Sequence, residues 1–334
     1  MRHFSASGLI LALALLLPMV SLLSMTLGTV SISVADLFAP DSNQVNTILF
    51  DIRLPRILLA ISVGAVLSST GAVMQGLFRN PLADPSLIGV SSGASVGASL
   101  MIVSASGFIQ AGALLGLSLV AVGAFVGGFV ATLLVYRLAT SGIGTSVTTM
   151  LLAGIAIGAL AGALNSLLSY FSDNDMLRQI SLWQMGSLSG ASWTKVVIMA
   201  SVAILLLACF PRESRALNAL LLGESEARHL GIDVQAVKRR LIILTALGVG
   251  VSVALAGLVG FVGLIIPHIV RLAIGPDHRW LIPASALAGA TLLVLADSLA
   301  RIVAIPAELP TGILTAMLGA PFFVALLLQQ RREV

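Results

Sequence analysis

A stretch of 22 residues without a formal charge separates Arg56 from Arg79, and it constrains the fold more than any other feature. At about 1.5 Å per residue, a helix of this length crosses the roughly 30 Å hydrocarbon core of a bilayer. The stretch ends in Arg-Asn-Pro-Leu-Ala-Asp-Pro at 79–85, and the residue before each proline is disfavoured in a helix. We therefore predict a membrane-spanning helix that ends in a bent, structured loop.

The composition extends this interpretation to the whole chain. The 334 residues are 58% hydrophobic and only 10% charged, whereas soluble domains carry about 25% charge. The apolar runs are continuous and do not alternate in steps of two, which argues against a membrane barrel. Basic residues lie at the ends of these runs, so they indicate topology and not a nucleic-acid partner. We predict an all-α integral membrane protein that forms a single domain over 1–334.

Ten crossings are predicted, each a nearly uncharged run. They are 7–27, 57–78, 88–105, 110–136, 144–170, 192–211, 240–257, 259–271, 281–299 and 309–329. The first is longer than the roughly 7–15 apolar residues of a signal peptide, so we expect it to be retained. The uncharged stretch 241–270 could form one long helix or two short ones. Two crossings place both the Lys238–Arg240 run and the Arg331–Arg332 pair in the cytoplasm, as the positive-inside rule favours.

This topology puts both termini in the cytoplasm, with thirteen cationic residues inside and five outside. The five outside are Arg53, Arg56, Arg178, Lys195 and Arg301. A faint internal repeat supports two related halves of opposite orientation, because Arg56, Gly64 and Ser68 align with Arg240, Gly248 and Ser252. An inverted repeat of five plus five spans is a common plan among transporters. Small residues spaced four apart, such as Gly93/Gly97 and Gly123/Gly127, predict close helix packing inside one bundle.

Catalytic and ion-coupling residues are scarce in the sequence. Neither lysine follows a glycine, so a phosphate-binding Gly-x-x-x-x-Gly-Lys loop is excluded. The four histidines show no metal-ligand spacing, and Cys209 is the one cysteine, so we expect no metal site. Asp297 is the sole candidate for a coupling carboxylate inside a span, and its spacing from Arg301 favours a structural ion pair. A proton-coupled transporter is thus the weaker alternative, and a membrane-embedded enzyme ranks last.

The segment 212–240 is the longest cytoplasmic stretch and the natural contact for a soluble partner. It reads as two short helices that are separated at Gly223 and ended by Gly231. Leu217, Leu220 and Leu221 form an apolar stripe on the first helix. Alone, the pair could be an ordinary surface element. In a chain without a nucleotide motif or coupling carboxylates, docking to an external motor is favoured.

Distinctive motifs occur in both halves of the chain. They are Arg53-Leu-Pro-Arg56, Gly71-Ala-Val-Met-Gln-Gly76, 79–85, Gly260-Phe-Val-Gly-Leu-Ile-Ile-Pro-His268, Ala296-Asp297, Glu308-Leu-Pro-Thr-Gly312 and Leu318-Gly-Ala-Pro321. Together they resemble the FecCD permeases, the membrane subunits of ATP-binding-cassette (ABC) importers for iron chelates, heme and vitamin B12. The resemblance implies a type II ABC importer permease fold and a homodimer in the bacterial inner membrane. It also implies two cytoplasmic ATPase subunits that bind ATP and Mg²⁺, a periplasmic substrate-binding protein, and no cofactor held by this chain.

The resemblance also assigns roles to single residues. It implies docking of the binding protein at Arg53, Arg56 and Arg301. It implies a cytoplasmic gate at Asn80 and Leu82, with Ser146 and Thr148 in a second loop, 141–149, whose length differs from the family pattern. It implies contact with the ATPase through 216–233, with Leu217, Leu221, Gly223, Glu224, Leu230 and Gly231 as the contact residues.

The substrate is indicated by the string 177–188 together with Trp193, which is most similar to hemin permeases. A large planar ligand with two propionates could meet Arg178 at the outer mouth. Ferric siderophores and cobalamin remain alternatives. We expect alternating access, driven by closure of the partner ATPases and by tilting of the spans around 144–170.

Overall fold

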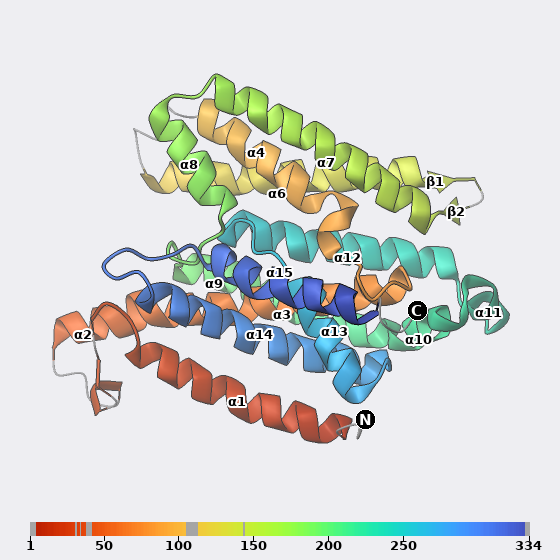
Figure 1. Cartoon of the computed structure of the whole chain (residues 1–334), viewed down its shortest axis with the longest axis horizontal. Helices are drawn as coiled ribbons and strands as arrows, with labels where there is room; N and C mark the ends of the chain where they lie inside the picture. The colour runs from red at the N-terminus through yellow and green to blue at the C-terminus, as the bar shows by residue number, and fades with distance from the viewer. Residues whose placement is uncertain are drawn as a thin grey trace.

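The computed structural model describes residues 5–30, 32–33, 35–37, 42–104, 113–142 and 144–330. Apart from one small hairpin, its regular structure is helical, and most helices run along the long axis of the molecule (Figure 1). The helices are α1 (Ala6–Thr26), α2 (Asn43–Thr47), α3 (Leu54–Leu77), α4 (Val90–Ser104), α6 (Ala113–Ala139), α7 (Val147–Tyr170), α8 (Asn174–Gln184), α9 (Trp193–Cys209), α10 (Ser214–Leu222), α11 (Glu224–His229), α12 (Val234–Ala256), α13 (Val262–Ile274), α14 (His278–Ile302) and α15 (Thr311–Gln330). Strands β1 (Thr140–Ser141) and β2 (Gly144–Thr145) pair in an antiparallel hairpin between α6 and α7.

Each predicted crossing corresponds to one apolar helix. Seven helical stretches of the described chain are long and apolar enough to cross a membrane, and α4, α13 and the Thr311–Ala325 part of α15 are shorter apolar stretches. The stretch 241–270 forms two helices, as predicted, because Gly257 (φ 69°) follows the end of α12 and Phe261 (φ 66°) precedes α13. Ten crossings stay a prediction, since length and composition alone do not place the three short helices across a bilayer.

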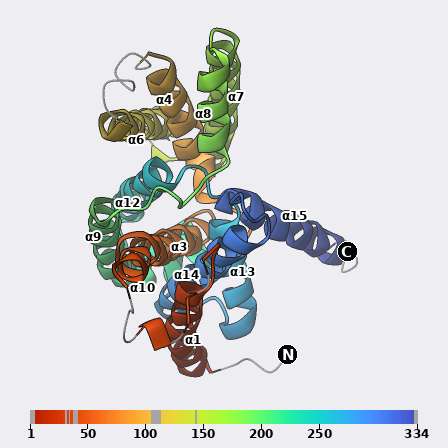
Figure 2. The same cartoon turned by 90° about the vertical axis from the view of Figure 1, so that its left-hand side faces the viewer.

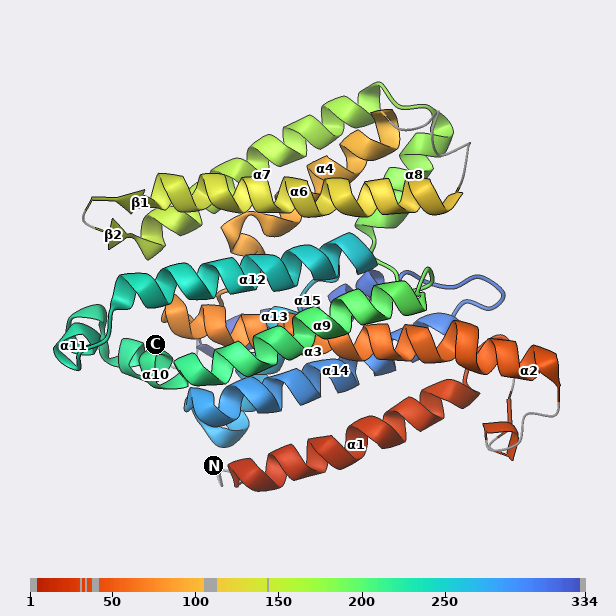
Figure 3. The same cartoon turned by 180° about the vertical axis from the view of Figure 1, so that it is seen from behind.

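The two ends of the molecule differ in what they carry (Figures 1 and 3). Helices α10 and α11 and the β1–β2 hairpin lie at one end, which we call the inner end. Helix α1 begins there and α15 ends there, so the first and last helices start and finish on one side, as predicted. Helices α2 and α8 lie at the opposite, outer end. The terminal cations Arg2, Arg331 and Arg332 lie outside the described residues.

Helix contacts repeat between the two halves, as an inverted repeat requires. In the first half, α3, α4, α6 and α7 correspond, in that order, to α12, α13, α14 and α15 of the second half. Helices that pack together in one half have corresponding helices that also pack together. Thus α3 packs on α14 as α12 packs on α6, and α4 packs on α7 as α13 packs on α15. The related helices α3 and α12 run in opposite directions (Figure 1). Helices α1 and α9 depart from the rule, because α1 packs on α14 whereas α9 packs on α3 and α12.

Helix α3 lies at the centre and is buried along nearly its whole length. Seen from the outer end, α4, α6 and α7 group on one side of α12, and α1, α3 and α14 lie on the other (Figure 2). Glycines allow the backbones to touch: a Cβ added to Gly71 would lie 1.8 Å from the carbonyl oxygen of Gly263. The predicted pairs behave alike, since a Cβ on Gly97 would lie 2.0 Å from the oxygen of Gly123. Small residues therefore pack helices within this chain.

Candidate functional site

Three arginines and two carboxylates meet at the outer end, where α3, α14 and the end of α1 come together. Arg56 Nε donates to both carboxylate oxygens of Asp297, at 3.0 and 2.9 Å, and its Nη1 donates to Glu308 Oε2 at 2.7 Å. Arg301 Nε lies 3.4 Å from Asp297 Oδ2. We call Arg53, Arg56, Asp297, Arg301 and Glu308 the arginine network. The predicted ion pair between Asp297 and Arg301 is confirmed, although the shorter contacts of Asp297 are to Arg56.

Arg53 and Arg301 hold the last turn of α1 and the segment that follows it. Arg53 donates to the carbonyl oxygens of Met25 and Val30. Arg301 donates to the carbonyl oxygen of Leu27 at 3.0 Å and to that of Ser24 at 3.1 Å. The last carbonyls of a helix have no partner within the helix, so these guanidinium groups fill that need.

Burial of the arginine network bears directly on the docking prediction. Arg53, Arg56 and Arg301 are 5%, 4% and 3% exposed. Their guanidinium groups are engaged within the chain, so in this conformation none of the three presents a free cation at the surface. A docking role for them stays a prediction. The exposed carboxylate of the network is Glu308, whose side chain is 36% exposed.

The α3–α4 connection, 78–89, forms the bent, structured loop predicted from its prolines. Asn80 Oδ1 accepts a hydrogen bond from the Leu82 N–H (2.9 Å), and Asp84 Oδ1 accepts one from the Ser86 N–H (2.8 Å). The second turn starts a short 3₁₀ helix, Pro85–Ile88, that packs on α7. There a Cβ on Gly154 would lie 1.9 Å from the carbonyl oxygen of Leu87. The first predicted gate loop thus lies against the helix that we expect to tilt.

The second predicted gate loop is the β1–β2 hairpin with the start of α7. Ser146 caps α7, because its hydroxyl accepts a hydrogen bond from the Thr149 N–H at 3.3 Å. Ser146 and Thr148 are both exposed at the inner end. Ile143 lies outside the described residues.

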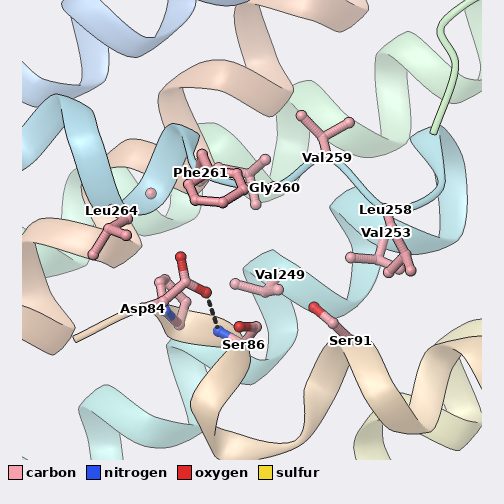
Figure 4. A pocket seen from close by; sticks show the side chains of 13 residues that line it. Asp84, Ser86, Ser91, Val249, Val253, Leu258, Val259, Gly260, Phe261 and Leu264 are labelled. Atoms are coloured by element: carbon pink, nitrogen blue, oxygen red, sulfur yellow. Dashed lines mark hydrogen bonds between the residues drawn. The ribbon is translucent and has the colours of Figure 1, made fainter. Parts of the chain in front are cut away.

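A cavity of about 330 Å³ lies between the α3–α4 connection, α12 and the start of α13 (Figure 4). Its polar groups are Asp84, Ser86 and Ser91, and its other walls are mainly apolar, among them Val249 and Phe261. The two connections that border it, α3–α4 and α12–α13, hold corresponding positions in the two halves. Interrupted helices at corresponding positions are typical of transporter binding sites. None of the predicted site residues lines this cavity, and no local sequence pattern pairs its two borders.

The outer-mouth residue Arg178 lies on α8, where it is exposed. The cavity between α3–α4 and α12–α13 does not include it. Arg178, the residue predicted to bind the propionates of the substrate, is therefore separate from the cavity.

Helices α10 and α11 confirm the predicted helix pair at the inner end. They are separated at Gly223 (φ 126°), and the second is followed by Gly231 (φ 81°), conformations that favour glycine. Asn218 fixes α10, because its Nδ2 donates to Asp277 Oδ1 at 2.7 Å and its Oδ1 accepts from the His278 N–H at 2.9 Å. Hydrogen bonds from Arg279 hold the pKa of Asp277, which precedes α14, well below its usual range.

The apolar stripe predicted on α10 faces the protein interior and is not free for a partner. Leu217 and Leu220 are 0% and 1% exposed, because they face the protein core, and Leu221 is half-buried. Leu222 and Leu230 are instead 70% and 65% exposed. Leu230 is among the contact residues predicted from the sequence, but Leu222 is not. Helical spacing shows which residues share an apolar face, but it does not show whether that face packs on the protein or is exposed.

The chain is similar to known proteins along nearly its whole length. Residues 15–329 match the FecCD transport family. This chain belongs to that family. The FecCD chain is 45% identical to the hemin transport system permease protein HmuU of Yersinia pestis over 322 residues, which cover 96% of this chain and 95% of that protein. It is 44% identical to the vitamin B12 import system permease protein BtuC of Escherichia coli O9:H4 (strain HS), over 97% of this chain and 95% of that protein.

Solved structures extend the comparison to the fold of this FecCD permease. An inward-facing conformation of a metal-chelate type ABC transporter matches with a TM-score of 0.85 and 35% identity, over 97% of this chain and 99% of that one. PsaBC from Streptococcus pneumoniae, in complex with Fab, matches with a TM-score of 0.58 and 20% identity, over 84% of this chain and 93% of that one. The second match concerns the fold alone. The first supports the predicted ABC importer permease fold.

Proposed function

We propose that this permease carries heme from the outer to the inner side of the bacterial inner membrane, driven by ATP that separate subunits hydrolyse. The observation that carries the proposal is its end-to-end similarity to a hemin permease, at 45% identity over 96% of the chain. The residues also supply no Gly-Lys phosphate loop of their own. The energy therefore has to come from a partner.

The residues are chemically compatible with heme and with other iron chelates. A tetrapyrrole combines a broad apolar face with propionates, and Arg178 offers an exposed cation at the outer end. The wall of the cavity at Val249 and Phe261 offers apolar surface. The 44% identity to a vitamin B12 permease keeps cobalamin as the second candidate, and ferric siderophores fit the same family.

Membership of the FecCD family supports the partners that we propose. We place two ATPase subunits at the inner end, against α10 and α11, with Gly223, Glu224, Leu230 and Gly231 at the contact. Leu222 joins them because it is 70% exposed. A second copy of this chain completes the pathway, with Asn80, Leu82, Ser146 and Thr148 at its inner gate. Both termini then lie in the cytoplasm.

A periplasmic binding protein docks at the outer end in this proposal. Arg53, Arg56 and Arg301 remain the cations that it would engage. Because Glu308 holds Arg56 Nη1 at 2.7 Å, a carboxylate of the binding protein has to replace a contact within the chain to reach it. If docking drew these buried arginines to the surface, the exposed ion pairs that formed would contribute only about 0.2–1 kcal/mol each. Docking through such pairs would therefore set orientation and association rate more than affinity.

The test reconstitutes the permease with its ATPase subunits and binding protein in liposomes. We expect uptake of hemin that requires ATP and the binding protein, with slower uptake of cobalamin and of a ferric siderophore. The permease alone should neither hydrolyse ATP nor accumulate hemin. Uptake by the permease alone under a proton gradient would contradict the proposal. Preferential uptake of cobalamin would identify cobalamin, and not heme, as the substrate.

A further inference from the structure

We infer that Lys238 is a positioning residue that ties helix α11 to the loop that starts α7, so that movement at the ATPase contact reaches the gate. The inference rests on the proposed function, because it takes α10–α11 as the ATPase contact and the β1–β2 hairpin as part of the gate. From the sequence, Lys238 is interpreted as one of three adjacent basic residues that mark the cytoplasmic side of the membrane. In the structure it differs from its neighbours.

Lys238 is buried, whereas Arg239 and Arg240 are exposed. Successive residues of a helix point about 100° apart, so one of the three faces inward. The Lys238 residue is 1% exposed. A buried ammonium is unfavourable unless partners surround it, and that of Lys238 has two.

The two partners of Lys238 belong to different elements. Its Nζ donates to Glu224 Oε1 at 2.6 Å and to the carbonyl oxygen of Thr145 at 2.8 Å. Glu224 is the first residue of α11, directly after the break at Gly223. Thr145 ends β2, and the next residue, Ser146, caps α7. A single side chain therefore bridges the proposed ATPase contact and the start of the helix that we expect to tilt.

A second side chain of α12 holds the same point of the hairpin. Gln235 Oε1 accepts a hydrogen bond from the Thr145 N–H at 2.9 Å. Both backbone polar groups of Thr145 are thus bound by α12, and Thr145 itself is 6% exposed. The hairpin continues to α6 as well, because the Ser146 N–H donates to the carbonyl oxygen of Ala139 at 2.9 Å.

The burial of the Lys238 ammonium makes separation of its two partners unfavourable. If α11 moves away alone, the buried ammonium keeps one neutral carbonyl and loses its carboxylate, which is costly at low dielectric. If α11, the start of α12 and the hairpin move as one unit, both contacts survive. The bridge therefore favours joint movement of Glu224 and Thr145 over separate movement.

The test uses the complete complex in liposomes and measures hemin uptake per ATP hydrolysed. In the Lys238→Met variant we expect assembly with the ATPase and at least half of its hydrolysis rate, but at least a tenfold lower uptake per ATP. Arg239→Met is the matched control, because it removes an exposed charge from the adjacent position. It should keep the ratio within twofold.

A distance measurement separates transmission from general weakening. Spin labels are placed at Gly142→Cys in one sample and at Ser225→Cys in another, each in a Cys209→Ser background. In the otherwise unmodified complex, the distance between the two copies of each label in the proposed dimer should change on nucleotide binding. With Lys238→Met, the label at 225 should still shift and the label at 142 should not. An unchanged uptake ratio, or unchanged coupled shifts, would overturn the inference.

Gln235→Ala provides the second variant should Lys238→Met fail to assemble. It removes one hydrogen bond to the hairpin and leaves the buried charge paired, and we expect at least a threefold lower uptake per ATP. An unchanged ratio there would overturn the inference as well. Absence of ATP-driven uptake in the unmodified complex would instead reject the proposed function.

Discussion

At the residue scale, the arginine network shows how far spacing can predict a site. Asp297 and Arg301 are one helical turn apart, and their ion pair follows from that spacing. Arg56 and Asp297 are 241 positions apart, so no local pattern indicates their closer contact. The same burial that creates this contact removes the three arginines from the surface.

The network predicts the consequence of one substitution. Asp297→Asn leaves Arg56 and Arg301 without their shared charge, and loss of one partner from a buried pair costs about 3–5 kcal/mol. We expect a clearly lower midpoint of thermal unfolding in detergent. The exposed Asp175→Asn on α8 is the control, with a change within about 0.5 kcal/mol. Normal stability combined with lost uptake would point to Asp297 as a proton carrier, the rival interpretation.

At the scale of elements, α10 illustrates what a helix needs besides its own sequence. Its boundaries follow from Gly223, which adopts a backbone conformation that other residues rarely reach. Its orientation follows from Asn218, which binds Asp277 and His278 at the start of α14. That orientation turns Leu217 inward and leaves Leu222 exposed.

The two leucines give a matched pair of variants. Leu222→Glu should leave the thermal midpoint nearly unchanged and reduce the amount of ATPase that copurifies, because it places a charge on the proposed contact. Leu217→Glu should destabilise the fold itself, since an unpaired charge in a core is strongly unfavourable. Thermal unfolding and ATPase stoichiometry, measured on both, check this. Full ATPase binding by Leu222→Glu would exclude that surface from the contact.

At the scale of the whole molecule, the placement of the ends tests the orientation. Helix α1 begins and α15 ends at the inner end with α10 and α11 (Figure 1). This arrangement agrees with an even number of crossings. It also assigns the arginine network and α8 to the opposite side.

Labelling of single cysteines checks this orientation in cells. In a Cys209→Ser background, Asp175→Cys should react with an impermeant maleimide in intact spheroplasts. Ser225→Cys should react only after permeabilisation, since we place α11 in the cytoplasm. Both positions should react in detergent, as the control for accessibility. The reverse pattern would leave an ATPase no surface at α10–α11.

The sequence by itself determined the class of the protein, the ten apolar helices and the division of 241–270, because charge and proline positions report on lipid and backbone geometry locally. It also located the breaks at Gly223 and Gly231. Only the tertiary structure decided which residues of those helices meet: Arg56 with Asp297, Lys238 with Thr145, and the α3–α4 connection with α13. In a chain so uniformly apolar, an inward face and a lipid-facing one have nearly the same composition. Contacts between distant segments are therefore set by backbone fit and by a few buried polar groups, which local patterns do not encode.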